Sequence, residues 1–542
     1  PPGEIIDSLI DTPTNYESEN GNAGGNYATL NLLSSASSTL SNGNLDFSNS
    51  NSSNKGGYGT IGMQSEKYYF EATMPSSGTN CQVGVVTQDG ISSSNYVGSN
   101  ANGWAYDANG TKYNNGSNSS YGATYTNNDV IGVAFDADNG TLTFYKNGTS
   151  QGTAFTGLTS GPYFPAVSTY NSGLVVNFGQ RPFAYTPPTG FVSLCTQNLT
   201  DPTIADGSTA MDVALYTGNG STQTISGLGF SPDWVWLKKR SGAADHYLYD
   251  QVRGATYRLY SNTADAESTS STGLTAFTSD GFTVGSANDV NQSSNTYVGW
   301  AWDAGTTTDT SNTDGSITPT GVRANPSAGF SIVSYTGTGS NATIGHGLNA
   351  TPDFYVVKRR SAADDWECYH SALGATYYGK LNATDAFTTA GGTSRWNDTP
   401  PTNSVFSVGT TDNVNGSSST YIAYCFAAVA GYSAFGSYTG NGSNDGPFLY
   451  TGFKPAFLII KNTTSGVAEY WLMMDSTRSP DNVVNEFLYP NGSGAEGTQY
   501  FETDFLSNGF KIRNSSRADN YNNESYVYMA FAEHPFKTAR AR

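Results

Sequence analysis

The chain has 542 residues, a formal net charge of −19 and only 13% charged residues. This length exceeds a single core and predicts about three to five domains, while the acidic balance argues against nucleic acid or an anionic membrane as a partner, because both need basic patches. Aromatic residues make up 13% of the chain, which excludes general disorder and, with frequent Gly, Asn and Ser between short apolar runs, predicts all-β modules joined by tight turns.

The first part of the chain, residues 1–199, contains short segments in which apolar and polar residues alternate. Turn residues bound these segments, which are 67–74, 80–87, 129–138, 140–148, 163–170 and 174–183. Alternation with a period of two is typical of half-buried antiparallel strands. The pattern therefore predicts an antiparallel β-sandwich.

The stretch DADNG at residues 136–140 allows two interpretations. An Asx-Gly pair supplies the positive φ that a hairpin turn requires, and the alternation resumes after Gly140. A calcium loop of the EF-hand type would need more oxygen ligands and a bidentate Glu at its end, where residue 147 is Asn. We therefore expect a turn between two strands.

At these residues the chain resembles a known family. The segment 127–148, NNDVIGVAFDADNGTLTFYKNG, followed by GPYFPAVSTY, VNFGQRPF and TPPTGFVSL, closely resembles a SPRY domain, and KYYFEATM at 67–74 resembles the opening strand of that family. The resemblance implies a concanavalin-A-like sandwich of jelly-roll type that recognises protein or peptide through variable loops and is not catalytic. Residues 11–31 also resemble the segment ahead of SPRY domains in phage structural proteins.

Loop aromatics are the first candidate binding residues. The stretch 101–125 is rich in Gly and Asn and alternates poorly, which is typical of a loop. Aromatic rings near Asn and Asp provide stacking and oriented hydrogen bonds for a carbohydrate or peptide. The candidates are Trp104, Tyr106, Asp107, Tyr113, Tyr121 and Tyr125. Alternatively, Trp104 and Tyr106 belong to a strand, because SPRY domains often place one there.

The remainder of the chain repeats one set of motifs three times. A YTG-x-GS motif starts each copy, at 216–221, 335–340 and 438–443, and a Pro-containing strand motif follows around Pro232, Pro352 and Pro455. The conserved order and spacing predict three antiparallel β modules of about 100 residues, at 200–308, 327–430 and 431–542, with 309–326 as a linker. These modules resemble those that follow SPRY domains in tail-fibre and virion proteins of marine phages, cyanophages especially.

The longest apolar run, residues 421–435, corresponds to the last strand motif of the other copies. It is too short to span a bilayer. We expect it to form a buried strand.

Basic clusters recur at corresponding places in the copies. They are Lys238, Lys239 and Arg240 in the first copy, Lys358, Arg359 and Arg360 in the second, and the reduced pair Lys461-Asn462 in the third. One interpretation is a pocket for an acidic glycan or for the carboxylates of a neighbouring chain. The other is a solvated strand end with a local salt bridge.

Residues suited to catalysis or metal binding are sparse. The histidines share no ligand spacing, and the cysteines lie too far apart for a metal knuckle or a disulfide-dense scaffold; they are His246, His346, His370, His534, Cys81, Cys195, Cys368 and Cys425. Glu71 and Asp136 are the strand acids that a glycoside hydrolase could use as its two carboxyl groups, yet both lie in SPRY-like motifs. We expect no cofactor, no metal and no catalytic residue.

These patterns predict a non-enzymatic virion structural protein, with a phage tail fibre or receptor-binding protein on the virion surface as the favoured function. Its partners would be a host cell-surface glycan or protein, other virion proteins and further copies of itself. The resemblance favours a trimer, in which many weak contacts add up to affinity. The alternatives are a capsid or tail decoration protein, a polysaccharide depolymerase and a bacterial adhesin or surface-filament subunit.

Overall fold

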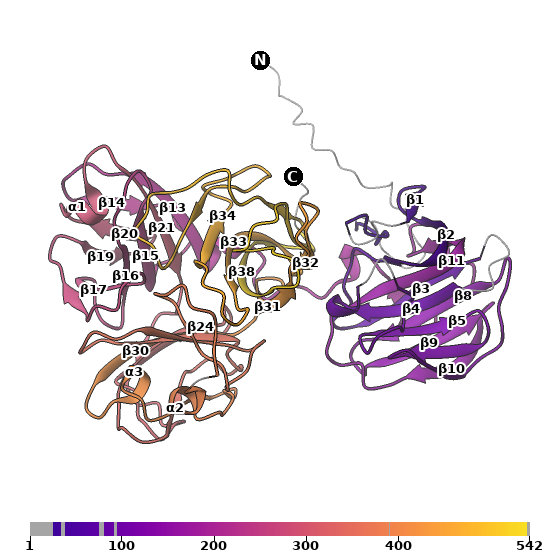
Figure 1. The fold of residues 1–542 in the computed structure, drawn as a ribbon, viewed down its shortest axis with the longest axis horizontal. Coiled ribbons are helices and arrows are strands. Elements are labelled where there is room, and N and C mark those ends of the chain that lie inside the picture. Colours follow the sequence, from indigo (N-terminus) through magenta and orange to yellow (C-terminus); the bar gives the residue numbers. More distant parts are fainter. Residues whose placement is uncertain (1–24, 34–37, 75–80, 92–94, 390, 539–542) are drawn as a thin grey trace, which may run out of the picture. The chain divides into compact units, whose positions relative to one another are not determined.

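The computed structural model describes residues 25–33, 38–74, 81–91, 95–389 and 391–538. Strands dominate the described residues, and the chain forms two compact units, Pro1–Asp201 and Pro202–Arg542 (Figure 1). The expected all-β class is confirmed. Residues 11–24 of the phage-like segment lie outside the described residues. None of the helices in the described ranges has the length and apolar character of a membrane-spanning segment.

The strands of the first unit form one sheet system, which is antiparallel except for the parallel pairing of β12 with β3. Its main path runs β10-β9-β8-β3-β11-β4-β5-β6-β7, with β2 beside β11 and β12 beside β3. Its strands are β1 (Thr39–Ser41), β2 (Asp46–Tyr58), β3 (Lys67–Thr73), β4 (Cys81–Thr87), β5 (Gly103–Asp107), β6 (Thr111–Asn114), β7 (Ser117–Ser120), β8 (Val130–Asp136), β9 (Thr141–Lys146), β10 (Thr149–Phe155), β11 (Tyr163–Asn177) and β12 (Val192–Ser193).

The DADNG stretch is the turn of the β8–β9 hairpin, as expected. Asp136 pairs with Thr141 across the ladder, and Gly140 has a φ of +60°. The Asp136 carboxylate accepts a hydrogen bond from the backbone N–H of Asn139 at 3.0 Å, which closes the turn. Ile131, Val133 and Phe135 are fully buried along β8, so this strand anchors the turn to the core.

The second unit contains three long antiparallel sheets, which define three blocks of the chain. Figure 1 shows them as magenta, orange and yellow parts of this unit. The first block has the sheet β13 (Met211–Thr217), β21 (Thr296–Trp302), β15 (Trp234–Lys239), β16 (His246–Asp250), β17 (Tyr257–Tyr260) and β18 (Ser268–Thr269). The second has β22 (Thr308–Asp309), β23 (Gly321–Asn325), β24 (Phe330–Thr336), β30 (Thr420–Phe426), β26 (Phe354–Arg359), β27 (Trp366–His370) and β28 (Gly379–Lys380). The third has β31 (Ser433–Thr439), β38 (Ser525–Pro535), β33 (Phe453–Asn462), β34 (Leu472–Asp475) and β35 (Phe487–Leu488).

Each block adds a small sheet, and the first and second blocks also contain short helical turns. The small sheets are β14 (Gln223–Ser226), β20 (Gly281–Val284) and β19 (Leu274–Thr278); β25 (Ala342–Gly345) and β29 (Val405–Val408); and β32 (Phe448–Tyr450), β37 (Gly509–Ile512) and β36 (Thr503–Leu506). The helices are α1 (Asn288–Asn291) in the first block and α2 (Gly392–Trp396) and α3 (Asp412–Asn415) in the second. Of the 3₁₀ turns, η3 (Gly207–Thr209) precedes β13, whereas η1 (Gln88–Gly90) and η2 (Thr196–Asn198) belong to the first unit.

Two expectations about segment boundaries need correction. The segment 309–326 is not an open linker, because β23 pairs with β24 and extends the second sheet, while Ile317 bridges to Ile344. The apolar run 421–435 is not one strand. It contains all of β30 except Thr420, a connection at 427–432 and the start of β31.

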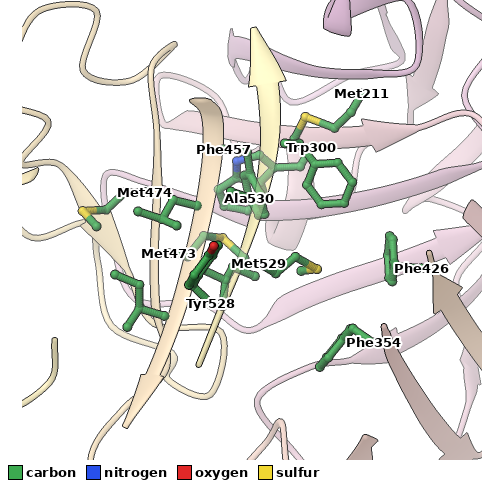
Figure 2. Packing of buried hydrophobic residues seen from close by; sticks show 14 of the residues in the cluster. Met211, Trp300, Phe354, Phe426, Phe457, Met473, Met474, Tyr528, Met529 and Ala530 are labelled. Carbon is green, nitrogen blue, oxygen red and sulfur yellow. The ribbon is translucent and has the colours of Figure 1, made fainter. Parts of the chain in front are cut away.

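The three blocks share one hydrophobic core. Figure 2 shows Trp300 of the first block, Phe354 and Phe426 of the second, and Phe457 and Met529 of the third around the same volume. The ring centroids of Trp234 and Tyr424 are 4.5 Å apart, and the rings are stacked. Because each sheet buries its face against the other two, the second unit is a single packed body and not a string of separate modules.

Candidate functional site

Tyr106 and Tyr125, expected as loop binding residues, lie inside the first unit. Tyr106 is on β5 with no exposed surface, and its ring packs on Phe144 with centroids 5.4 Å apart. The Tyr125 hydroxyl donates to the carbonyls of Cys81 and Tyr106, at 2.8 and 2.9 Å. Burial raises the pKa of Tyr125 well above its ordinary value. These two tyrosines are structural, which corrects the expectation that they contact a ligand.

The other four candidates of this stretch are also tied to the sandwich. The Asp107 carboxylate is buried, which raises its pKa, and accepts hydrogen bonds from Gln82 at 2.5 Å and from the N–H of Asn109 at 2.9 Å. Trp104 contacts Tyr163 edge to face at 5.5 Å. Tyr113 and Tyr121 are half-buried, and the Tyr121 hydroxyl donates to the carbonyl of Gly152.

Glu71 and Asp136, the two acids considered for hydrolysis, each have a structural role. Glu71 is 2% exposed and accepts hydrogen bonds from the backbone N–H groups of Ala184 (2.8 Å) and Tyr185 (3.0 Å). Burial raises the pKa of Glu71 more than these bonds lower it. Asp136 forms a 3.0 Å ion pair with Lys67. Burial favours a higher pKa for Asp136, but its bonds to Asn139 and Lys67 outweigh that effect and hold the pKa below its usual range.

The lysine of each basic cluster is buried between two blocks. Lys238, Lys358 and Lys461 have no exposed surface. Each ammonium group donates to a backbone carbonyl of another block: Lys238 to Ser493 at 3.4 Å, Lys358 to Ala264 at 3.2 Å and Lys461 to Thr384 at 2.7 Å. The first block thus contacts the third, the second contacts the first, and the third contacts the second, so the three contacts close a ring.

Burial shifts the charge state of these three lysines. It lowers the pKa of Lys238, Lys358 and Lys461 to about 8 in each case, because a charged amine loses its hydration inside the protein. No acidic ligand has access to these amines. The expected pocket for an acidic glycan is therefore absent at the three buried lysines.

The arginines of the clusters bind carboxylates of a neighbouring block. Arg240 forms three hydrogen bonds with Glu496, at 3.0, 2.9 and 2.8 Å, and Arg360 forms two with Glu267, both at 2.9 Å. The intervening residues stay within their own block: Lys239 donates to Gln292 at 2.8 Å. Arg359 likewise pairs with Asp364 at 3.2 Å. The buried lysines and the last arginines therefore join parts of this chain, which corrects the pocket interpretation. Arg359 forms the local salt bridge of the other interpretation.

A buried charge network surrounds Arg360 at the junction of the first and second blocks. Arg253 donates to Asp250 at 2.5 Å and to Glu267 at 3.1 Å, and Glu267 in turn binds Arg360. The Tyr424 hydroxyl of the second block donates to Asp250 at 2.7 Å. Paired charges that also have hydrogen bonds offset the cost of their burial.

The junction of the third and first blocks carries a matching network. Arg478 donates to Asp475 at 2.5 Å and to Glu496 at 3.0 Å, and Glu496 binds Arg240. The indole N–H of Trp300 donates to Asp475 at 2.9 Å, in the position that Tyr424 has at the other junction. Sequence reasoning missed both networks, although the sequence contains a signal: in the first and third blocks an Asp is followed three residues later by Arg and further on by Glu.

Among the described residues, no group of three or more His, Cys, Asp or Glu side chains has a geometry that could hold a metal ion. The four cysteines are all buried. His370 is 2% exposed, and burial lowers its pKa to about 4. Its Nε2 lies 3.2 Å from the carbonyl oxygen of Tyr528, across the junction of the second and third blocks.

Residues 67–181 of the first unit match the SPRY domain model. Residues 206–535, more than half of the chain, match the model described as "Domain of unknown function (DUF7483)". The chain therefore belongs to the DUF7483 family and carries a SPRY β-sandwich ahead of that region.

Curated relatives match only part of the chain. ATP-dependent RNA helicase DDX1 of Xenopus laevis is 33% identical over 138 residues, which is 25% of this chain and 18% of the relative. The probable ATP-dependent RNA helicase ddx1 of Dictyostelium discoideum is 32% identical over 127 residues, 23% of this chain and 16% of the relative. The chain thus spans less than a fifth of the length of these relatives.

Solved structures match a similar share of the chain. The SPRY domain of human HERC1 is 21% identical, with a TM-score of 0.25, and covers 27% of this chain and 96% of its own. Stonustoxin is 20% identical, with a TM-score of 0.23, and covers 28% of this chain and 27% of its own.

Proposed function

We propose that the chain is a non-enzymatic virion surface protein, a phage tail fibre or receptor-binding protein that attaches to a host through exposed loops. The observation that carries the proposal is the use of its reactive groups. Glu71 and Asp136 fix strands and a turn, and the buried lysines and arginines join the blocks. These groups serve the scaffold, and the loops remain as the surface that meets a partner.

In this proposal the three blocks are homologous repeats. They share the order of their central strands, in which the last strand of the sheet lies beside an early one: β21 beside β13, β30 beside β24 and β38 beside β31. They also share the contact from a buried lysine to the next block. A rigid body of three repeats keeps exposed loops in fixed positions, so several weak contacts act together, and further copies of the chain in a trimer multiply them.

Exposed aromatic side chains in the third block supply a surface for such contacts. Tyr470, Tyr500 and Tyr521 are 44%, 78% and 50% exposed. The Tyr470 ring stacks on Tyr489 with centroids 4.5 Å apart, which holds it in place for contact with the apolar face of a sugar or with a peptide. The partner in this proposal is a host surface glycan or protein.

The test is binding of the purified, fluorescently labelled chain to a panel of bacterial cells, cyanobacteria included. Saturable binding that also competes with adsorption of the phage supports attachment. Incorporation into particles without cell binding would favour a decoration protein and contradict the receptor role. Tyr470→Ser and Tyr500→Ser should weaken cell binding without changing thermal unfolding, because both side chains are exposed.

A further inference from the structure

The junction of the second and third blocks lacks the charge network of the other two. Strand register places Asp250, His370 and Asp475 at the same position, because they pair with Trp234, Phe354 and Phe457. Each of these three aromatic residues lies four residues before the buried lysine of its block. At this junction His370 replaces the Asp of the network, Leu373 replaces its Arg and Phe387 replaces its Glu. Thr463 replaces the arginine that the neighbouring block contributes, which is Arg240 or Arg360 at the other two junctions. All four charges are replaced together.

The replacement changes how the junction is filled. Phe387 is 3% exposed and turns toward Trp471, with ring centroids 6.0 Å apart. Thr463 is too short to cross the junction as Arg240 and Arg360 do. The connection after the central strand is also longer here: seven residues separate Thr463 from Trp471, against five between Arg360 and Trp366.

A cavity of about 370 Å³ lies at this junction. The second block contributes Tyr378, Lys380, Asp385 and Phe387 to its wall, and the longer loop of the third block contributes Ser465 and Val467. This volume is at the small end of the roughly 300–1,000 Å³ that small-molecule sites occupy. It suits one or two sugar rings.

The wall combines apolar surface with a few charged groups. Lys380 is paired with Asp365 at 2.7 Å, so its charge is compensated, and Asp385 adds an exposed carboxylate. A further anion would be repelled by Asp385. A neutral sugar fits better, because its hydroxyls can donate to the carboxylate and accept from the ammonium, while its C–H face packs on an aromatic ring.

From these features we infer that the cavity between the second and third blocks binds a neutral sugar residue, such as the end of a surface glycan. This inference rests on the proposed function and names the ligand class for it. The position also explains the loss of the charge network: with Arg and Glu present, as at the other two junctions, the space would be closed by their paired side chains.

The chain offers matched control positions for a test. Ala386 lines the cavity, and Ala266 is the corresponding residue at the junction where Arg360 and Glu267 are paired. Ala386→Trp fills the cavity, whereas Ala266→Trp adds the same bulk elsewhere. Asp385→Asn and Asp265→Asn form a second matched pair with little risk to folding, because both carboxylates are exposed.

The experiment is saturation-transfer NMR of the full chain with glucose, galactose, mannose and N-acetylglucosamine as probes. At least one sugar should give a signal that is lost in Ala386→Trp and kept in Ala266→Trp. Its affinity should fall about tenfold in Asp385→Asn and stay unchanged in Asp265→Asn. No signal from any of the four sugars, or equal signals in all variants, overturns the inference. Cell binding separates the attachment function from the sugar site. If Ala386→Trp still binds cells saturably and the wild-type chain binds none of the sugars, the attachment function stands and the cavity inference falls.

Discussion

Removing Arg360 should destabilise the second unit far more than removing an ordinary surface arginine. Arg360 makes two charge-assisted hydrogen bonds to Glu267, and the side chains are 20% and 12% exposed. Such bonds contribute about 1.5–3 kcal/mol each when well buried, and partial exposure reduces this. We expect Arg360→Ala to lower the free energy of unfolding by about 2–3 kcal/mol.

A double-mutant cycle with Glu267→Ala isolates the pair itself, with an expected coupling energy of about 1.5–2 kcal/mol. The control is Arg513 with Asp504, which lie 3.4 Å apart with side chains 42% and 23% exposed. This exposed pair should couple by less than about 0.5 kcal/mol.

The assay is urea unfolding followed by tryptophan fluorescence. Trp104 is the only tryptophan of the first unit, so the other seven of the eight report on the second unit. The reasoning is refuted if the coupling energy of Arg360 and Glu267 is no larger than that of Arg513 and Asp504, because the pair then does not hold two blocks together.

Three further predictions concern buried groups. The pKa of Lys461 is about 8 in the folded chain and near 10.5 when unfolded, so the unfolded state binds more protons between those values. The free energy of unfolding of the wild type should therefore rise by up to about 1.4 kcal/mol per pH unit relative to Lys461→Met between pH 8 and 9.5. A difference that does not depend on pH would contradict this. Burial raises the pKa of Asp519 to about 7, so the folded state binds more protons than the unfolded state between about pH 4 and 7. The wild type should therefore lose stability relative to Asp519→Asn as the pH rises through this range. A loss of stability on acidification would be inconsistent with the structure. Tyr125→Ala should cost about 3–5 kcal/mol, as for other buried aromatics, in thermal or chemical unfolding of the first unit, and an unchanged transition would place this side chain at the surface.

Sequence patterns predict the strands of this protein well where the alternation is long. The hairpin at residues 129–148 is an example, because two strands of six and seven residues flank an Asn-Gly turn. The stretch 101–125 misled because β5, β6 and β7 have only five, four and four residues. Turn residues between such short strands obscure the period, so Tyr106 resembles a loop residue although it is buried.

The role of the basic clusters could not be predicted from the sequence alone. Their partners are distant in the chain: Arg240 and Glu496 are 256 residues apart, and Arg360 and Glu267 are 93 apart. Only the closed arrangement of three blocks brings them together. The concerted change to Leu373, Phe387 and Thr463 in one junction is the trace that this arrangement leaves in the sequence.

A single time course decides whether this protein binds its target without chemical conversion. The full chain is incubated with host polysaccharide, and bound protein and new reducing ends are measured in the same samples. We expect saturable binding while the reducing-end signal stays at the level of a protein-free control. Reducing ends that accumulate in proportion to protein concentration would contradict it and establish a depolymerase.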